Sequence, residues 1–166
     1  VEAMTMSNRL AVMMDGEILQ TGSPKEVYGQ PADVRIAEFI GSPKINLVPA
    51  TVGENGGIDI LDQCLPLKTS LPAGSKLQVG IRPEAFGLLN GSNEPGLSIY
   101  VEYMENTGSD ILVHGRHEHL DIPIISRLNP KEGDLVQLGT PLRLRLPRRR
   151  SLIFDHHGKR IARETG

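Results

Sequence analysis

Two pairs of histidines are the first candidates for chemistry in this sequence of 166 residues. His117 and His119 place two imidazoles on one face of an extended segment, and His156 and His157 add an adjacent pair. Imidazole nitrogen is a common zinc ligand, but a zinc site needs further ligands. No third ligand can be assigned to either pair, and both pairs lie at polar turns. We therefore expect solvent-exposed histidines and no metal site.

A run of three arginines, Arg148 to Arg150, is a second candidate, because clustered guanidinium groups can contact phosphate groups. The chain has 18 Lys and Arg against 20 Asp and Glu, a formal charge of -2. No overall field therefore attracts a phosphate backbone, and aromatic residues for base stacking are lacking nearby. We expect a solvated turn or ion pairs with a partner, and no nucleic-acid binding.

Two charged turns could form a subunit contact or a regulatory surface. Arg82 and Glu84 flank a proline, which also suits a local structural pair. In the second turn, which contains Glu105, Gly108 and Asp110, the glycine most simply supplies a positive backbone dihedral angle, and the aspartate caps the turn. The structural and the functional interpretations both remain open.

Cys64, the single cysteine, lies between apolar residues, and we expect it to be a small core residue. One cysteine cannot form an intrachain disulfide, which fits a reducing compartment. No apolar run approaches the roughly 20 residues that span a bilayer, and the first nine residues lack the features of a signal peptide. We expect a cytosolic protein that reaches any membrane through a partner.

The first 40 residues are predicted to alternate helix, hairpin, helix and helix. Asp15 and Gly16 between apolar runs are a strong hairpin signal, and Ser23, Pro24 and Glu26 form a capping-box pattern. The expected elements are a helix over 1–6, strands over 9–14 and 17–20, and helices over 23–28 and 32–40. This segment is too short to bury both faces of its hairpin, so we expect it to need a missing sheet.

From about residue 45 the pattern changes to short strands separated by turn residues. Leu142, Leu144 and Leu146 alternate with Arg143 and Arg145, as in a strand with one solvated face. The predicted strands cover 46–52, 58–61, 76–81, 97–104, 110–114, 120–125, 135–138, 142–146 and 152–154. So many short strands predict a mainly β fold, a small barrel or sandwich.

Several segments resemble one family in order and spacing, the ATPase subunits of bacterial maltose, glycerol-3-phosphate and related sugar importers. Residues 1–6 (VEAMTM) are similar to the stretch after the switch histidine, and residues 8–16 to the next strand and turn. Residues 41–46 (GSPKIN) are similar to the linker before the regulatory domain. The segments 23–28, 31–32 and 37–43 continue the match.

The β region has weaker matches, at 80–84 (GIRPE), at Glu105-x-x-Gly108-x-Asp110, where the family usually ends in Glu, and at 154–158. The resemblance implies an OB-fold-like, transport-associated (TOBE/MOP-like) Greek-key barrel over 43–166. It also implies a short α/β remnant of the ABC nucleotide-binding domain over 1–42.

The sequence contains no phosphate loop of the form G-x4-G-K-[ST] and no Walker-B carboxylate. The resemblance implies a parent that uses ATP and Mg²⁺, whereas we expect this fragment to be non-catalytic and to have no cofactor of its own. It also implies a regulatory and dimerisation role, with a homodimer, transmembrane permease subunits and a regulatory protein or small ligand as partners. This assembly would lie at the inner face of the cell membrane. An oxyanion-sensing barrel and an OB-type nucleic-acid binder are the alternatives.

Overall fold

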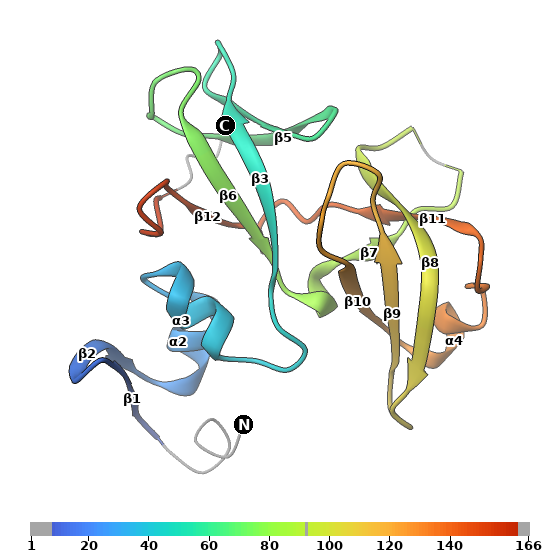
Figure 1. Ribbon diagram of the computed structural model, residues 1–166, viewed down its shortest axis with the longest axis horizontal. Helices are drawn as coiled ribbons and strands as arrows, with labels where there is room; N and C mark the ends of the chain where they lie inside the picture. The colour runs from blue at the N-terminus through green and yellow to red at the C-terminus, as the bar shows by residue number, and fades with distance from the viewer. Residues whose placement is uncertain (1–7, 92, 163–166) are drawn as a thin grey trace.

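The chain folds into a β-hairpin and two short helices, followed by two five-stranded antiparallel sheets (Figure 1). The computed structural model describes residues 8–91 and 93–162, so the helix expected over 1–6 lies outside the described residues. No described helix is long and apolar enough to cross a membrane. The prediction of a mainly β fold is confirmed.

The hairpin pairs β1 (Leu10–Met14) with β2 (Glu17–Gly22). Between them Asp15 and Gly16 have φ values of 51° and 79°, the positive angles that a type I′ turn requires. The hairpin turn predicted from these two residues is therefore confirmed.

The two helices are α2 (Pro24–Gly29) and α3 (Val34–Phe39). Ser23 Oγ accepts from the Glu26 amide at 3.2 Å, and the Glu26 carboxylate accepts from the Ser23 amide at 3.0 Å. This is the predicted capping box. The second helix begins later than expected, because the Asp33 side chain caps it by accepting from the Arg35 amide at 2.8 Å.

The helices cover one face of the hairpin only. Val12 on β1 is buried in a cluster with residues of both helices, among them Val27 and Ile36. On the other face Met13 and Ile18, which lie opposite each other in the register, are 59% and 61% exposed. The expectation that this segment cannot bury both faces of its hairpin is confirmed.

The first large sheet has the strand order β12-β6-β3-β4-β5. Its strands are β3 (Asn46–Val52), β4 (Gly57–Ile60), β5 (Gln63–Lys68), β6 (Lys76–Ile81) and β12 (Leu152–Phe154). The strands predicted over 46–52, 76–81 and 152–154 have the predicted bounds. β5 was not predicted because it contains a proline, which is tolerated here since β5 is an edge strand.

The second sheet has the order β10-β9-β8-β11-β7 and follows a 3₁₀ turn, η1 (Pro83–Ala85). Its strands are β7 (Gly87–Leu88), β8 (Gly96–Asn106), β9 (Ile111–Arg116), β10 (Ile124–Leu128) and β11 (Pro141–Arg145). The two-residue β7 has too little sequence for a periodic signal and was not predicted.

Two predicted strands of this region are wrong. Residues 135–138 form turns after the short helix α4 (Pro130–Gly133), in which the Leu135 amide donates to the Glu132 carbonyl. The cause is a second capping box, formed by Asn129 and Glu132, which starts a helical turn instead of a strand. The strand expected over 120–125 begins only at Ile124, because a turn occupies the residues before it.

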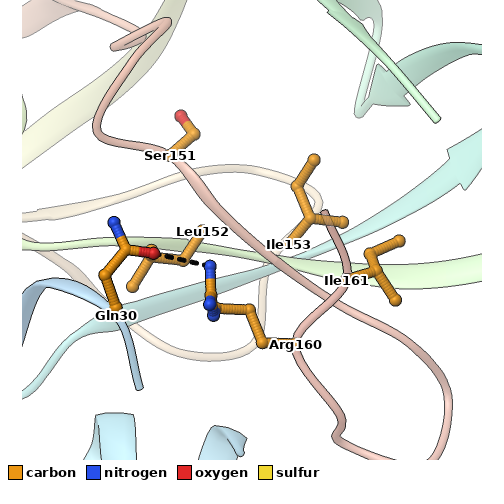
Figure 2. Close-up of a pocket in the computed structure, with 6 residues that line it drawn as sticks. All are labelled: Gln30, Ser151, Leu152, Ile153, Arg160 and Ile161. Atoms are coloured by element: carbon orange, nitrogen blue, oxygen red, sulfur yellow. Dashed lines mark hydrogen bonds between the residues drawn. The ribbon is translucent and has the colours of Figure 1, made fainter. Parts of the chain in front are cut away.

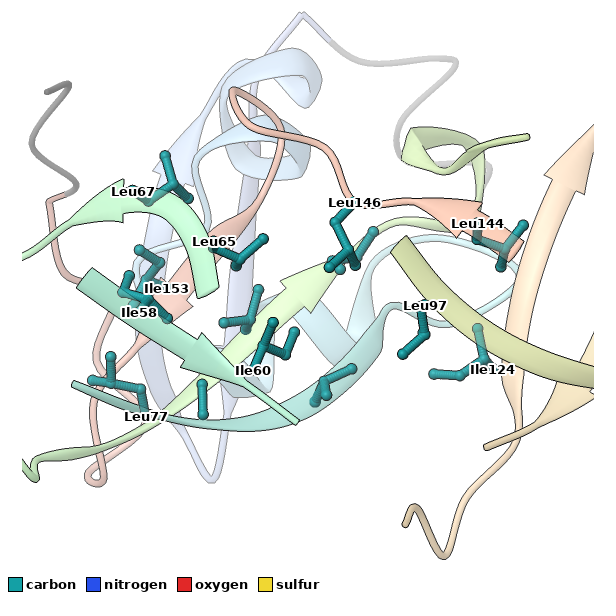
Figure 3. Close-up of a cluster of buried hydrophobic side chains, with 14 of the residues drawn as sticks. Ile58, Ile60, Leu65, Leu67, Leu77, Leu97, Ile124, Leu144, Leu146 and Ile153 are labelled. Atoms are coloured by element: carbon teal, nitrogen blue, oxygen red, sulfur yellow. The ribbon is translucent and has the colours of Figure 1, made fainter. Parts of the chain in front are cut away.

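One hydrophobic core joins the two sheets (Figure 3). Ile58, Ile60 and Ile153 from the first sheet belong to the same buried cluster as Leu97 and Leu144 from the second. On β11 the buried Leu144 alternates with the arginines, as predicted for this strand. The two sheets are therefore held together by burial of apolar side chains from both.

Candidate functional site at the junction of the N-terminal segment and the β region

Arg82 is a buried charged residue that reaches from the β region into the N-terminal helices. It follows β6 directly, and its side chain is 4% exposed. Nη1 donates to the carbonyls of Ala37 at 2.8 Å and Ile40 at 2.6 Å, and Nη2 donates to the Tyr28 carbonyl at 3.1 Å. These three carbonyls lie at the carboxyl ends of α2 and α3, where helices leave backbone acceptors without intrahelical partners.

Tyr28 completes the surroundings of the guanidinium. Its ring lies under Arg82, with 4.1 Å between the guanidinium carbon and the ring centroid, a cation–π geometry. The phenol donates a short hydrogen bond to the Glu84 carboxylate. Burial, followed by this hydrogen bond and the negative charge of Glu84, raises the pKa of Tyr28 to about 12. Burial also lowers the pKa of the Arg82 guanidinium.

The local pair between Arg82 and Glu84 that the sequence suggested is not formed among the described side chains. Glu84 instead lies 3.7 Å from the Arg150 guanidinium, in addition to accepting from Tyr28. One arginine of the run 148–150 thus makes an intramolecular ion pair. Both residues thus make contacts with other segments and not with each other.

The second charged turn reaches this junction through Asp110 alone. Its carboxylate lies 3.9 Å from Arg127 Nε, and Arg127 Nη2 donates to the Ser42 carbonyl at 2.7 Å. Gly108 has a φ of 92°, as expected at the β8–β9 turn, and Glu105 is exposed on β8. The structure therefore brings Arg82, Glu84 and Asp110 to one region and leaves Gly108 and Glu105 in the turn.

Asn46 is a buried residue between the two sheets that the sequence did not single out. It is 4% exposed and donates to the carbonyls of Ile81 at 3.0 Å and Ile125 at 2.8 Å, while its oxygen accepts from the Ile125 amide at 2.8 Å. The side chain thus connects the first sheet to the edge strand β10. A polar residue at the start of an apolar strand was the only signal in the sequence.

The C-terminal segment provides a further connection between the two parts. The Val34 amide donates to the Gly158 carbonyl at 2.8 Å, and the Arg160 amide donates to the Ala32 carbonyl at 3.1 Å. Figure 2 shows the Arg160 guanidinium donating to the Gln30 side chain at 2.7 Å, beside a cavity of about 30 Å³. Helix α3 also shares a buried cluster, including Ala37 and Phe154, with the first sheet. The domain boundary at 42/43 stays a prediction.

Two expectations about single residues are wrong. His117 is 7% exposed, and its Nδ1 accepts from the His119 amide at 3.1 Å. Cys64 is exposed, since on β5 the alternation directs Leu65 inward and the cysteine outward. The described residues contain no group of three or more metal-ligating side chains.

Comparison with known proteins agrees with this architecture. Residues 41–86 match the MalK OB fold domain, and residues 79–154 match the TOBE domain. The sn-glycerol-3-phosphate import ATP-binding protein of Chromohalobacter salexigens is 34% identical over 97% of the chain, and that of Escherichia coli O157:H7 is 37% identical over 97%. The chain covers 44% and 45% of these relatives, less than half of their length.

A solved structure supports the fold alone. The cytoplasmic molybdate-binding protein ModG aligns with a TM-score of 0.54 and 16% identity, covering 65% of this chain and 94% of ModG. By its MalK OB fold domain and TOBE domain, the chain belongs to the family of sugar-type ABC importer ATP-binding subunits.

Proposed function

We propose that this chain is the non-catalytic regulatory and dimer-stabilising region of an ABC importer ATP-binding subunit that serves the uptake of a sugar or sugar phosphate. The named relatives are import ATP-binding proteins for sn-glycerol-3-phosphate. Their remaining length would contain the phosphate loop that this sequence lacks. ATP, Mg²⁺ and the permease subunits would belong to that larger protein.

The observation that carries the proposal is the Arg82 junction. A scaffold transmits movement only if its parts are joined rigidly, and a buried guanidinium bound to three carbonyls joins two helices to the β region. The helices precede the matched OB domain in the chain. The β region would then act mechanically, by keeping two ATP-binding subunits together while they open and close.

Two measurements on the 166-residue chain test this proposal. With Mg²⁺ and ATP it should show no hydrolysis, and in sedimentation it should form a homodimer at high concentration. An ATP-hydrolysing activity that co-purifies with the chain would disprove the non-catalytic role. A pure monomer at high concentration would disprove the dimer-stabilising role.

An oxyanion-sensing barrel is the second candidate, because the chain is similar in fold to the molybdate-binding protein ModG. Calorimetric titration with molybdate and sulfate separates the two functions. A scaffold should give no saturable heat with either anion, whereas a sensor should give heat that saturates at a defined ratio.

A further inference from the structure

A groove of about 370 Å³ lies between the start of β5 and the middle of β8, and residues after β9 form its third side. Its volume falls in the range of small-molecule sites. None of the junction residues lines it. The polar side chains that line it and carry the argument are Asp62, Gln63, Tyr100, Arg116, His117 and Glu118.

One buried polar atom of these residues has no hydrogen-bond partner in the described part of the chain. Gln63 donates through its amide nitrogen to the Gly96 carbonyl, while its buried Oε1 accepts nothing. His117 Nδ1 accepts the His119 amide, so a neutral imidazole carries its proton on Nε2 and can donate from there. The lining thus offers an acceptor without a partner, Gln63 Oε1, and a donor, His117 Nε2. A ligand hydroxyl can donate to the first and accept from the second.

The charges of the groove disfavour an anionic ligand. The Arg116 guanidinium is bound to the Glu102 carboxylate at 2.8 Å. Asp62 and Glu118 add two further carboxylates to the lining, so the local balance is acidic. A phosphate or a molybdate would meet net repulsion here, whereas a neutral ligand would not.

Tyr100 supplies the remaining feature. It lies on β8, lines the groove and is 51% exposed, so its ring offers an apolar face beside the polar groups. Sugar rings present C–H groups on one face and hydroxyls at the edge, which matches an exposed aromatic face next to hydrogen-bonding side chains.

We propose that this groove binds a neutral saccharide of about disaccharide size, with hydroxyls at Gln63 and His117 and a sugar face on Tyr100. The site lies within the β region and goes beyond the scaffold function, which rests on different residues. It would allow the β region to respond to an uncharged carbohydrate in the solution around it.

Calorimetric titration of the whole chain tests the site. The probes are the neutral disaccharides maltose, trehalose, sucrose and cellobiose, with sn-glycerol 3-phosphate and molybdate as anionic comparisons. At least one disaccharide should give saturable heat, and the anions should bind about tenfold more weakly or not at all. Absence of binding for all four disaccharides at about 10 mM, enough to nearly fill a site of millimolar Kd, would overturn the proposal.

Matched variants locate the binding. Tyr100→Ala should weaken it about tenfold through loss of the aromatic face. Tyr103→Ala removes a similarly exposed tyrosine of the same strand that does not line the groove, and it should leave the affinity unchanged. Equal effects of the two variants would place the ligand elsewhere.

Nitrogen NMR of the histidines gives a readout that does not depend on a variant. On saturation with the bound disaccharide the Nε2 resonance of His117 should shift while it remains protonated, and those of His156 and His157 should not move. An unmoved His117 resonance would contradict the proposed contact. Loss of this site would leave the junction and the scaffold proposal untouched.

Discussion

At Arg82 the shape of the side chain matters more than its charge, because its partners are backbone carbonyls of two helices. Lysine would keep the charge but cannot donate to three carbonyls in a fixed planar arrangement. We expect Arg82→Lys to lower the free energy of unfolding by about 2 kcal/mol, measured by urea denaturation.

The matched control is Arg149→Lys, which changes an exposed arginine of the run 148–150. It should stay within about 0.5 kcal/mol of the wild type. If both substitutions have the same small effect, the buried hydrogen bonds of Arg82 do not stabilise the junction in the way described.

Tyr28 gives the junction a pH dependence at alkaline pH. Its pKa is raised from 10.0 to about 12, first by burial and then by Glu84. Between these values the unfolded chain releases the phenolic proton and the folded chain keeps it. The stability from this group is therefore fully present below pH 10 and is lost as the pH rises through about 12.

Spectrophotometric titration of the phenolate checks this directly. Tyr28→Phe should remove one titration step with a midpoint near 12 and should flatten the alkaline decline of the urea midpoint. If Tyr28→Phe instead removes a titration step with a midpoint near the ordinary tyrosine pKa of 10.0, the phenol is not buried against Glu84.

At the scale of elements, Asn46 determines how firmly β10 is attached to the first sheet. Asn46→Ala leaves the Ile81 and Ile125 carbonyls and the Ile125 amide without their side-chain partner. We expect a loss of about 2 to 3 kcal/mol in stability, and faster hydrogen exchange at the Ile125 amide. Thr51→Ala, at an exposed position of the same strand, is the control and should change neither.

The elements also show what local sequence can and cannot predict. The capping box at Ser23 and the turn at Asp15 depend on neighbouring residues only, so the sequence predicted them correctly. The Arg82 junction joins Arg82 to Ala37 and Ile40, which lie 45 and 42 positions earlier in the chain. No local sequence pattern predicts such distant contacts. The strand predicted over 135–138 was wrong, because it rested on hydrophobicity alone, and the second capping box starts a helical turn just before these residues.

For the whole molecule, the exposed apolar face of the hairpin bears on self-association. The sequence suggested that one face of the hairpin would be uncovered. Val12 is buried against the helices, whereas the large side chains of Met13 and Ile18 are exposed to solvent. A face of two large side chains in an open hairpin favours pairing with a second copy. This narrows the expected dimer contact to that face.

Sedimentation of Met13→Ser with Ile18→Ser should therefore show a dimer at least about tenfold weaker than that of the wild type, since about 1 kcal/mol or more of apolar burial is lost per side chain. Phe39→Ser is the matched control, because Phe39 is 70% exposed on α3 and lies outside the hairpin. A dimer weakened by Phe39→Ser and not by the hairpin variant would move the contact to the helices.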